Sequence, residues 1–156
     1  MTASSTAHVE LMDKIAALVG VRERTCKELR ERLIRQGSEP AAVDEALEAA
    51  VRVGLVDERR YALAYIRGKS RAGWGRAKIA ARLAAAGVPD SVVEECADAF
   101  PGPEDELEQA LRELSRRPTR SSNPYGALMR RLVGKGYSVE LARRAVRLFL
   151  DGEGRA

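Results

Sequence analysis

The chain has 156 residues, enough for one ordinary domain or for a few small units that share a core. Hydrophobic residues make up 45% of it and aromatic residues only 4%, and the abundance of Ala, Leu, Arg and Glu favours helices over strands. The formal charge of +4 is modest, but acidic and basic residues form separate blocks along the chain. Such blocks indicate faces that meet a polyanion or an acidic partner, although a solvated helical surface would produce them as well.

Several classes of function are not supported by the sequence. The two cysteines, Cys26 and Cys96, have no CxxC spacing, and His8 is the single histidine, so neither a disulfide framework nor a metal site is expected. No constellation of catalytic residues emerges. The N-terminal segment has no basic region followed by a long apolar run, and no apolar segment approaches the roughly 18 residues that span a bilayer. We therefore expect a cytoplasmic protein that is not an enzyme and has no metal, cofactor or membrane partner.

Helical periodicity predicts three short helices in the first third of the chain. They span about 8–19, about 25–36, and a segment that starts near Pro40, a residue tolerated in the first turn of a helix. Gly37 ends the second helix as a C′ glycine.

The same pattern then begins again. Asp57 can cap a helix that runs to about residue 70, the next helix spans about 75–86 and ends at Gly87, and Pro89 and Asp90 open a third. After a Pro-Gly-Pro break at 101–103, helices are predicted at about 104–116, from 124 to near Gly136, and at about 139–150.

The middle and last helices of these triplets superpose without gaps, with a period of 50 and then 49 residues. Five sets of positions correspond: Leu29, Ile79 and Leu128; Leu33, Leu83 and Leu132; Gly37, Gly87 and Gly136; Val43, Val93 and Ala142; Ala46, Cys96 and Ala145. The sequence predicts an all-α protein of three tandem three-helix repeats, at 8–53, 54–100 and 104–150, in an elongated, curved arrangement with flexible tails at 1–7 and 151–156. Because Cys96 occupies an alanine position, we expect it to be a small buried thiol. No chemistry is assigned to Cys26.

Basic residues gather around the turn at 71–75, in a stretch without any acidic residue between Glu58 and Asp90. The helix dipole explains cations at the end of the preceding helix but not Arg76 and Lys78, which open the following one. Trp74 is either a plug between neighbouring repeats or a partner contact. A second basic group follows at 116–135. The predicted basic surface for partner or DNA binding comprises Arg67, Lys69, Arg71, Trp74, Arg76, Lys78, Arg82, Arg130, Arg131 and Lys135.

The central stretch reads Gly54-Leu55-Val56-Asp57-Glu58-x-Arg60-Tyr61-Ala62, followed by Arg67, Arg71, Gly73, Gly75, Ile79, Leu83, Gly87 and Val88. It resembles the RecX family, bacterial regulators of the RecA recombinase, and weaker similarity extends over about 10–150. The resemblance implies a monomer of three helical repeats that lies in the groove of the RecA filament on single- or double-stranded DNA. There it would inhibit strand exchange, ATP hydrolysis and co-protease activity, with a role in DNA repair and SOS regulation. It carries over no catalytic residue, and only Arg67, Arg71 and their neighbours as contacts.

Two other functions remain open from the sequence. One is a stand-alone helical DNA-binding protein whose triplets contact duplex DNA. The other is a helical adaptor that binds an acidic protein face and no DNA.

Overall fold

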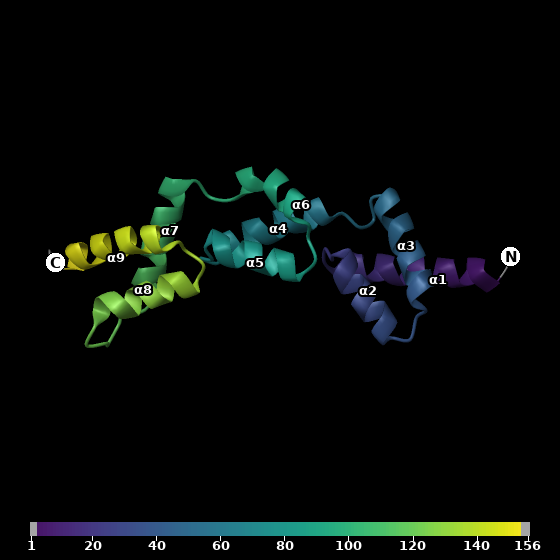
Figure 1. The fold of residues 1–156 in the computed structure, drawn as a ribbon, viewed down its shortest axis with the longest axis horizontal. Coiled ribbons are helices and arrows are strands. Elements are labelled where there is room, and N and C mark those ends of the chain that lie inside the picture. The colour runs from purple at the N-terminus through teal and green to yellow at the C-terminus, as the bar shows by residue number, and fades with distance from the viewer. Residues whose placement is uncertain (1–2, 154–156) are drawn as a thin grey trace. The chain divides into compact units, whose positions relative to one another are not determined.

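The computed structural model describes residues 3–153, which form nine α-helices, one short 3₁₀ helix and no strand (Figure 1). The helices are α1 Ala3–Val21, α2 Cys26–Arg35, α3 Pro40–Arg52, α4 Glu58–Arg71, α5 Arg76–Ala85, α6 Asp90–Glu95, η1 Ala97–Ala99, α7 Pro103–Arg116, α8 Pro124–Gly134 and α9 Val139–Glu153. For this part of the chain the predicted all-α class and the three successive sets of three helices are confirmed. Residues 1–2 and 154–156, the ends of the predicted tails, lie outside the described residues.

The first and last helices are longer than their apolar stripes. Helix α1 begins at Ala3, so residues 3–7, which the sequence assigned to a tail, are helical although they are mostly exposed. Helix α9 likewise continues to Glu153. No proline interrupts either extension, and adding a residue to an existing helix costs little compared with starting one.

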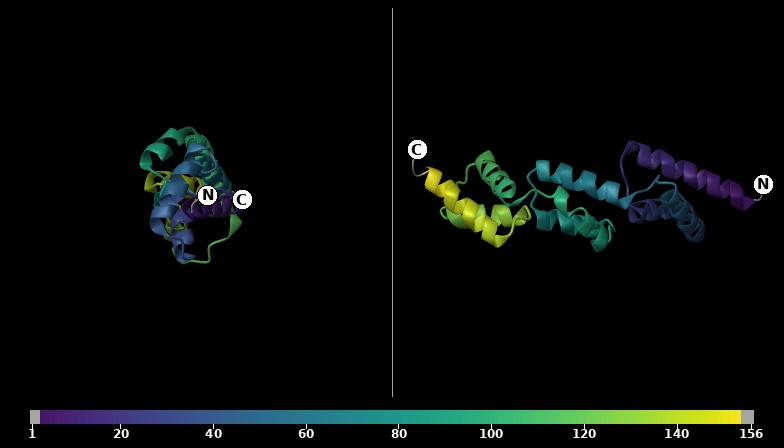
Figure 2. Two further views of the ribbon diagram at one scale, coloured as in Figure 1. Left: turned by 90° about the vertical axis from the view of Figure 1, so that its right-hand side faces the viewer. Right: turned by 90° about the horizontal axis from the view of Figure 1, so that it is seen from above.

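The chain divides into two compact units, Met1–Leu63 with Leu83–Glu94, and Ala64–Arg82 with Glu95–Ala156. Helices α4 and α5 each contribute residues to both units. In the first unit, α3 packs against α1 and α2 (Figures 1 and 2). Their buried core consists of Leu11, Ile15, Leu29, Leu33, Val43, Ala46, Leu47, Ala50 and Val56.

In the second unit, α7, α8 and α9 pack against one another. Their core consists of Leu107, Ala110, Leu114, Leu128, Leu132, Tyr137, Ala142, Ala145 and Val146. Most of the repeat positions predicted from the sequence are core positions: Leu29, Ile79 and Leu128 are fully buried, whereas Val93 is only half-buried. The repeat boundaries themselves stay a prediction.

The corresponding glycines end their helices in the same way. Gly37, Gly87 and Gly136 have φ of +97°, +88° and +98°, a conformation that glycine adopts without strain. After each of them, the next backbone N–H donates to the carbonyl five residues back, at 3.1, 3.0 and 3.1 Å. This is the Schellman pattern of helix ends, and it confirms Gly37 as the C′ glycine predicted from the sequence.

Among the described residues, no helix is both long and apolar enough to cross a membrane.

Candidate interface at the Trp74 turn

The turn between α4 and α5 is held by hydrogen bonds to residues 135–137, which follow α8. The Tyr137 hydroxyl donates to the Gly73 carbonyl at 2.7 Å. The Gly75 N–H donates to the Lys135 carbonyl at 2.7 Å, and the Ala77 N–H donates to the Gly136 carbonyl at 3.2 Å. The first amides of α5 thus find acceptors that their own helix cannot supply.

The backbones at this junction approach too closely for side chains. A Cβ at Gly75 would collide with the backbone of Gly136 and Tyr137, and a Cβ at Gly136 would lie 2.6 Å from the Lys78 amide nitrogen. Glycine is therefore required at Gly75 and Gly136, and Gly73, with φ of +88°, adopts a conformation that favours glycine, so both glycines of Gly-Trp-Gly have a structural reason.

Three cations surround Trp74, the half-buried side chain at the tip of the turn. The Nζ atoms of Lys78 and Lys69 lie 4.0 and 4.5 Å from the centre of its ring, and the Cζ of Arg82 lies 5.8 Å from it. Attraction between a cation and an aromatic ring orders these side chains but leaves their charges in place. No carboxylate pairs with any of the three among residues 3–153. The tip of the turn is thus an ordered group of uncompensated positive charge, called the Trp74 cluster below.

The other predicted binding residues of this region lie elsewhere. Arg67 and Arg71 line a separate hollow beside α7. The guanidinium of Arg76 lies 4.5 Å from the centre of the Phe100 ring, and Arg76 also interacts with Glu106. Burial raises the pKa of the Glu106 carboxyl, and Arg76 partly offsets that rise. Arg76 therefore has structural partners that its position at the start of a helix did not reveal.

The second basic group is dispersed. Arg131 donates to the Arg117 carbonyl at 2.8 Å, where it fixes the linker before α8. The Nζ of Lys135 lies 3.9 Å from a carboxylate oxygen of Glu113, and Arg130 is exposed. The structure thus gathers three of the nine predicted cations around Trp74 and separates the rest. Binding by any of them stays a prediction.

Glu113 and Tyr137 are site residues that sequence reasoning did not single out. Glu113 belongs to an acidic helix that looked solvated, yet it is only 5% exposed and packs against Gly73. One of its oxygens lies 2.7 Å from a guanidinium nitrogen of Arg116. Burial, with a smaller effect of Glu113 and Glu106, raises the pKa of Tyr137 to about 12. The sequence signal that could have pointed to Tyr137 is its position directly after Gly136, the glycine that follows α8.

The segment that carries the family resemblance has a structural role in the first unit. Asp57 caps α4 by accepting from the Arg60 N–H at 3.1 Å. Arg60 pairs with Glu23 at 2.6 Å and donates to the Gly54 and Leu55 carbonyls at 3.2 and 3.3 Å.

Two further side chains of this segment reach α2. Glu58 accepts from the Cys26 N–H at 3.3 Å, and the Tyr61 hydroxyl donates to Glu28 at 3.2 Å. Residues 57–61 thus fasten the start of α4 to α2.

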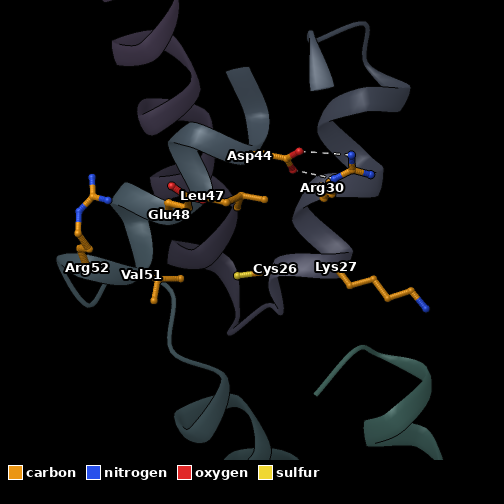
Figure 3. Close-up of a pocket in the computed structure, with 8 residues that line it drawn as sticks. All are labelled: Cys26, Lys27, Arg30, Asp44, Leu47, Glu48, Val51 and Arg52. Atoms are coloured by element: carbon orange, nitrogen blue, oxygen red, sulfur yellow. Dashed lines mark hydrogen bonds and ion pairs between the residues drawn. The ribbon is translucent and has the colours of Figure 1, made fainter. Parts of the chain in front are cut away.

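Cys26 lies at an open hollow of about 650 Å³ in the first unit (Figure 3). Figure 3 shows Arg30 and Asp44 facing each other in an ion pair, at 2.7 Å, while Lys27 extends away from the sulfur. Burial and the nearby Glu58 raise the pKa of the Cys26 thiol, which disfavours the reactive thiolate.

Cys96 is 2% exposed, so the predicted buried thiol is confirmed. No group of three or more potential metal ligands occurs among residues 3–153.

Comparisons with known proteins identify the family. Residues 57–96 match the family model described as RecX, second three-helix domain. The regulatory protein RecX of Mycobacterium sp. (strain KMS) is 35% identical over 145 residues, which cover 87% of this chain and 79% of that protein. The chain belongs to the RecX family.

Other RecX proteins agree with this assignment. The regulatory protein RecX of Thermus thermophilus is 35% identical over 127 residues, covering 81% of this chain and 83% of that protein. The regulatory protein RecX of Halorhodospira halophila is 36% identical over a match that spans 61% of this chain and 59% of that protein. These relatives are named as regulatory proteins, so the chain belongs to a family of regulatory proteins.

Solved RecX structures share the fold. The crystal structure of RecX from Lactobacillus salivarius superposes with a TM-score of 0.77 at 16% identity, covering 93% of this chain and 97% of that one. A second, described as a crystal structure of regulatory protein RecX, gives a TM-score of 0.78 at 19% identity, covering 92% and 74%. The predicted fold of three-helix repeats is confirmed.

Proposed function

We propose that this chain binds the RecA filament on DNA and inhibits its recombinase, ATPase and co-protease activities. Membership of the RecX family supports a regulatory role, and the Trp74 cluster is the observation that carries the DNA contact. Its three cations are ordered around one aromatic ring and have no counter-charge among the described residues. Such a group attracts the phosphates of a nucleic acid, and an indole ring can stack on an unpaired base.

The size of the cluster indicates that DNA alone is not its complete partner. Three phosphates neutralised on a single strand give a salt slope of only about −2, since each contributes roughly −0.7. That is a small electrostatic contribution to affinity. A regulator with this cluster therefore needs further contacts, and in our proposal the RecA protomers supply them.

Co-sedimentation with RecA filaments on single-stranded DNA tests this proposal. The variant Lys69→Gln/Lys78→Gln/Arg82→Gln removes the cluster's charge, and we expect it to bind filaments at least tenfold more weakly than the unaltered chain. The charge-matched control is Lys14→Gln/Arg35→Gln/Arg52→Gln, three exposed cations of the first unit. Equal losses for the two variants, or filament binding by neither protein, would sink the proposal.

The two alternatives give different results in a titration without RecA. A stand-alone DNA-binding protein would bind an oligonucleotide tightly at physiological salt and leave RecA unaffected. A helical adaptor would bind no DNA with or without RecA.

A further inference from the structure

Helix α4 carries its cations on two different faces. Successive residues of an α-helix are rotated by about 100°, so Lys69, two residues from Arg67 and two from Arg71, is about 160° away from each of them. Lys69 belongs to the Trp74 cluster, whereas Arg67 and Arg71, four residues apart, share the opposite face. The two groups therefore cannot contact the same strand of a partner in the same way.

The face with Arg67 and Arg71 opens into a hollow of about 450 Å³ within the second unit. Helix α7 contributes Asp105, Glu108, Gln109 and Arg112 to the lining. No ion pair engages the three arginines or the two carboxylates among the described residues. The hollow is thus a concave site with free groups of both charges.

Buried polar groups in the same hollow also lack partners. Ser70 is 6% exposed, and its hydroxyl oxygen has no hydrogen-bond partner in the described structure. The Gln109 amide nitrogen donates to the Ser70 carbonyl, which fixes the orientation of the amide and leaves Gln109 Oε1 buried without a donor. Buried polar groups are usually satisfied, so the wall of this hollow has an unused hydroxyl and an unused amide acceptor.

The chemistry of the lining separates two classes of ligand. The phosphodiester backbone of a nucleic acid offers acceptors only and repeats its negative charge at every nucleotide, so Asp105 and Glu108 would repel it more strongly than they repel a single carboxylate. An acidic side chain offers a planar carboxylate that matches the fork of an arginine. Peptide N–H groups beside that carboxylate can donate to Gln109 or to the carboxylates of the lining, so an acidic peptide offers partners for groups of both charges.

We propose that the hollow lined by Arg67, Arg71 and Arg112 binds an acidic side chain of a partner protein, while the Trp74 cluster on the opposite face binds the DNA. This division of the basic residues rests on the proposed function, in which the partner protein is RecA. It assigns Arg67 and Arg71 to protein recognition, and it adds Arg112, Ser70 and Gln109 to the binding residues.

Two probes test the division on the full chain by NMR. A capped peptide of alternating glutamate and glycine should shift the Nε–Hε signals of the three arginines and leave the Trp74 indole N–H unchanged. A single-stranded oligonucleotide should shift the indole signal and leave those arginines unchanged. Arg67→Gln/Arg112→Gln should weaken peptide binding at least tenfold and change oligonucleotide affinity less than twofold, whereas Lys14→Gln/Arg35→Gln should change neither.

Either of two results would overturn the assignment. One is a peptide that shifts none of the three arginines, or that shifts the indole as strongly as it shifts them. The other is an Arg67→Gln/Arg112→Gln variant, folded by circular dichroism, that loses as much oligonucleotide affinity as the Trp74-cluster variant. Neither measurement contains RecA, so a failure of the proposed function leaves both of them interpretable.

Discussion

At the scale of single residues, Tyr137 connects the Trp74 turn to the core of the second unit. The side chain is 2% exposed, and its hydroxyl donates to the Gly73 carbonyl at 2.7 Å. Gly73 is itself buried, so this carbonyl has little access to water. The position of Trp74 therefore depends on a contact between residues 64 positions apart.

Replacing Tyr137 with Phe removes that hydrogen bond and leaves the Gly73 carbonyl unpaired. We expect the free energy of unfolding to fall by about 1–3 kcal/mol, the usual cost of an unsatisfied buried group. Urea denaturation measures it, with Tyr125→Phe as the control because Tyr125 is 38% exposed. A loss no greater than that of the control would show that the hydroxyl does not hold the turn.

Tyr137 also predicts how stability depends on alkaline pH. Its pKa is raised from 10 to about 12 by burial first and by Glu113 and Glu106 next, so the folded state holds the proton more tightly than the unfolded state. The resulting stability is fully present below pH 10 and is lost as the pH rises through 12. Between pH 9 and 12, Tyr137→Phe should therefore lose less stability than the unaltered chain, as thermal unfolding would reveal. Parallel curves would contradict this.

At the scale of elements, the helix ends are the features most accessible from sequence, because they are determined locally. The glycine register and the helix-opening prolines located α2, α3, α5 and α8 within a few residues. Contacts between distant segments were not accessible. The stacking of Arg76 on Phe100, the burial of Glu113 and the dispersal of the second basic group all depend on tertiary packing.

Alanine substitutions at Gly136 and Gly37 together separate the cost of backbone strain from the cost of steric crowding. Their φ angles are +98° and +97°, but a Cβ at Gly136 would collide with Lys78, whereas one at Gly37 meets nothing within 4 Å. Gly37→Ala should cost about 1–2 kcal/mol from the left-handed conformation alone. Gly136→Ala should cost clearly more, since α5 and α8 must also separate. Equal losses in chemical denaturation would mean that the close approach contributes nothing.

At the scale of the whole molecule, the family and the class of fold were predictable because repetition and one segment with the family's motif extend over much of the chain. That segment proved to be structural, since Asp57, Glu58 and Arg60 fasten α4 to its surroundings. Of the residues proposed for binding, only Arg67 and Arg71 belong to the family's motif, and a pattern of charges alone could not divide the basic residues between two faces. The elongated arrangement, the monomeric state and the cytoplasmic location stay predictions.

The ATPase activity of RecA on single-stranded DNA is the most direct measurement of the central proposal. Added near the RecA concentration or below it, the unaltered chain should reduce the rate of ATP hydrolysis, and Lys69→Gln/Lys78→Gln/Arg82→Gln should need at least tenfold more protein for the same reduction. The charge-matched control in the first unit should inhibit like the unaltered chain. An ATPase rate that stays constant as the unaltered chain is added in excess would contradict the account.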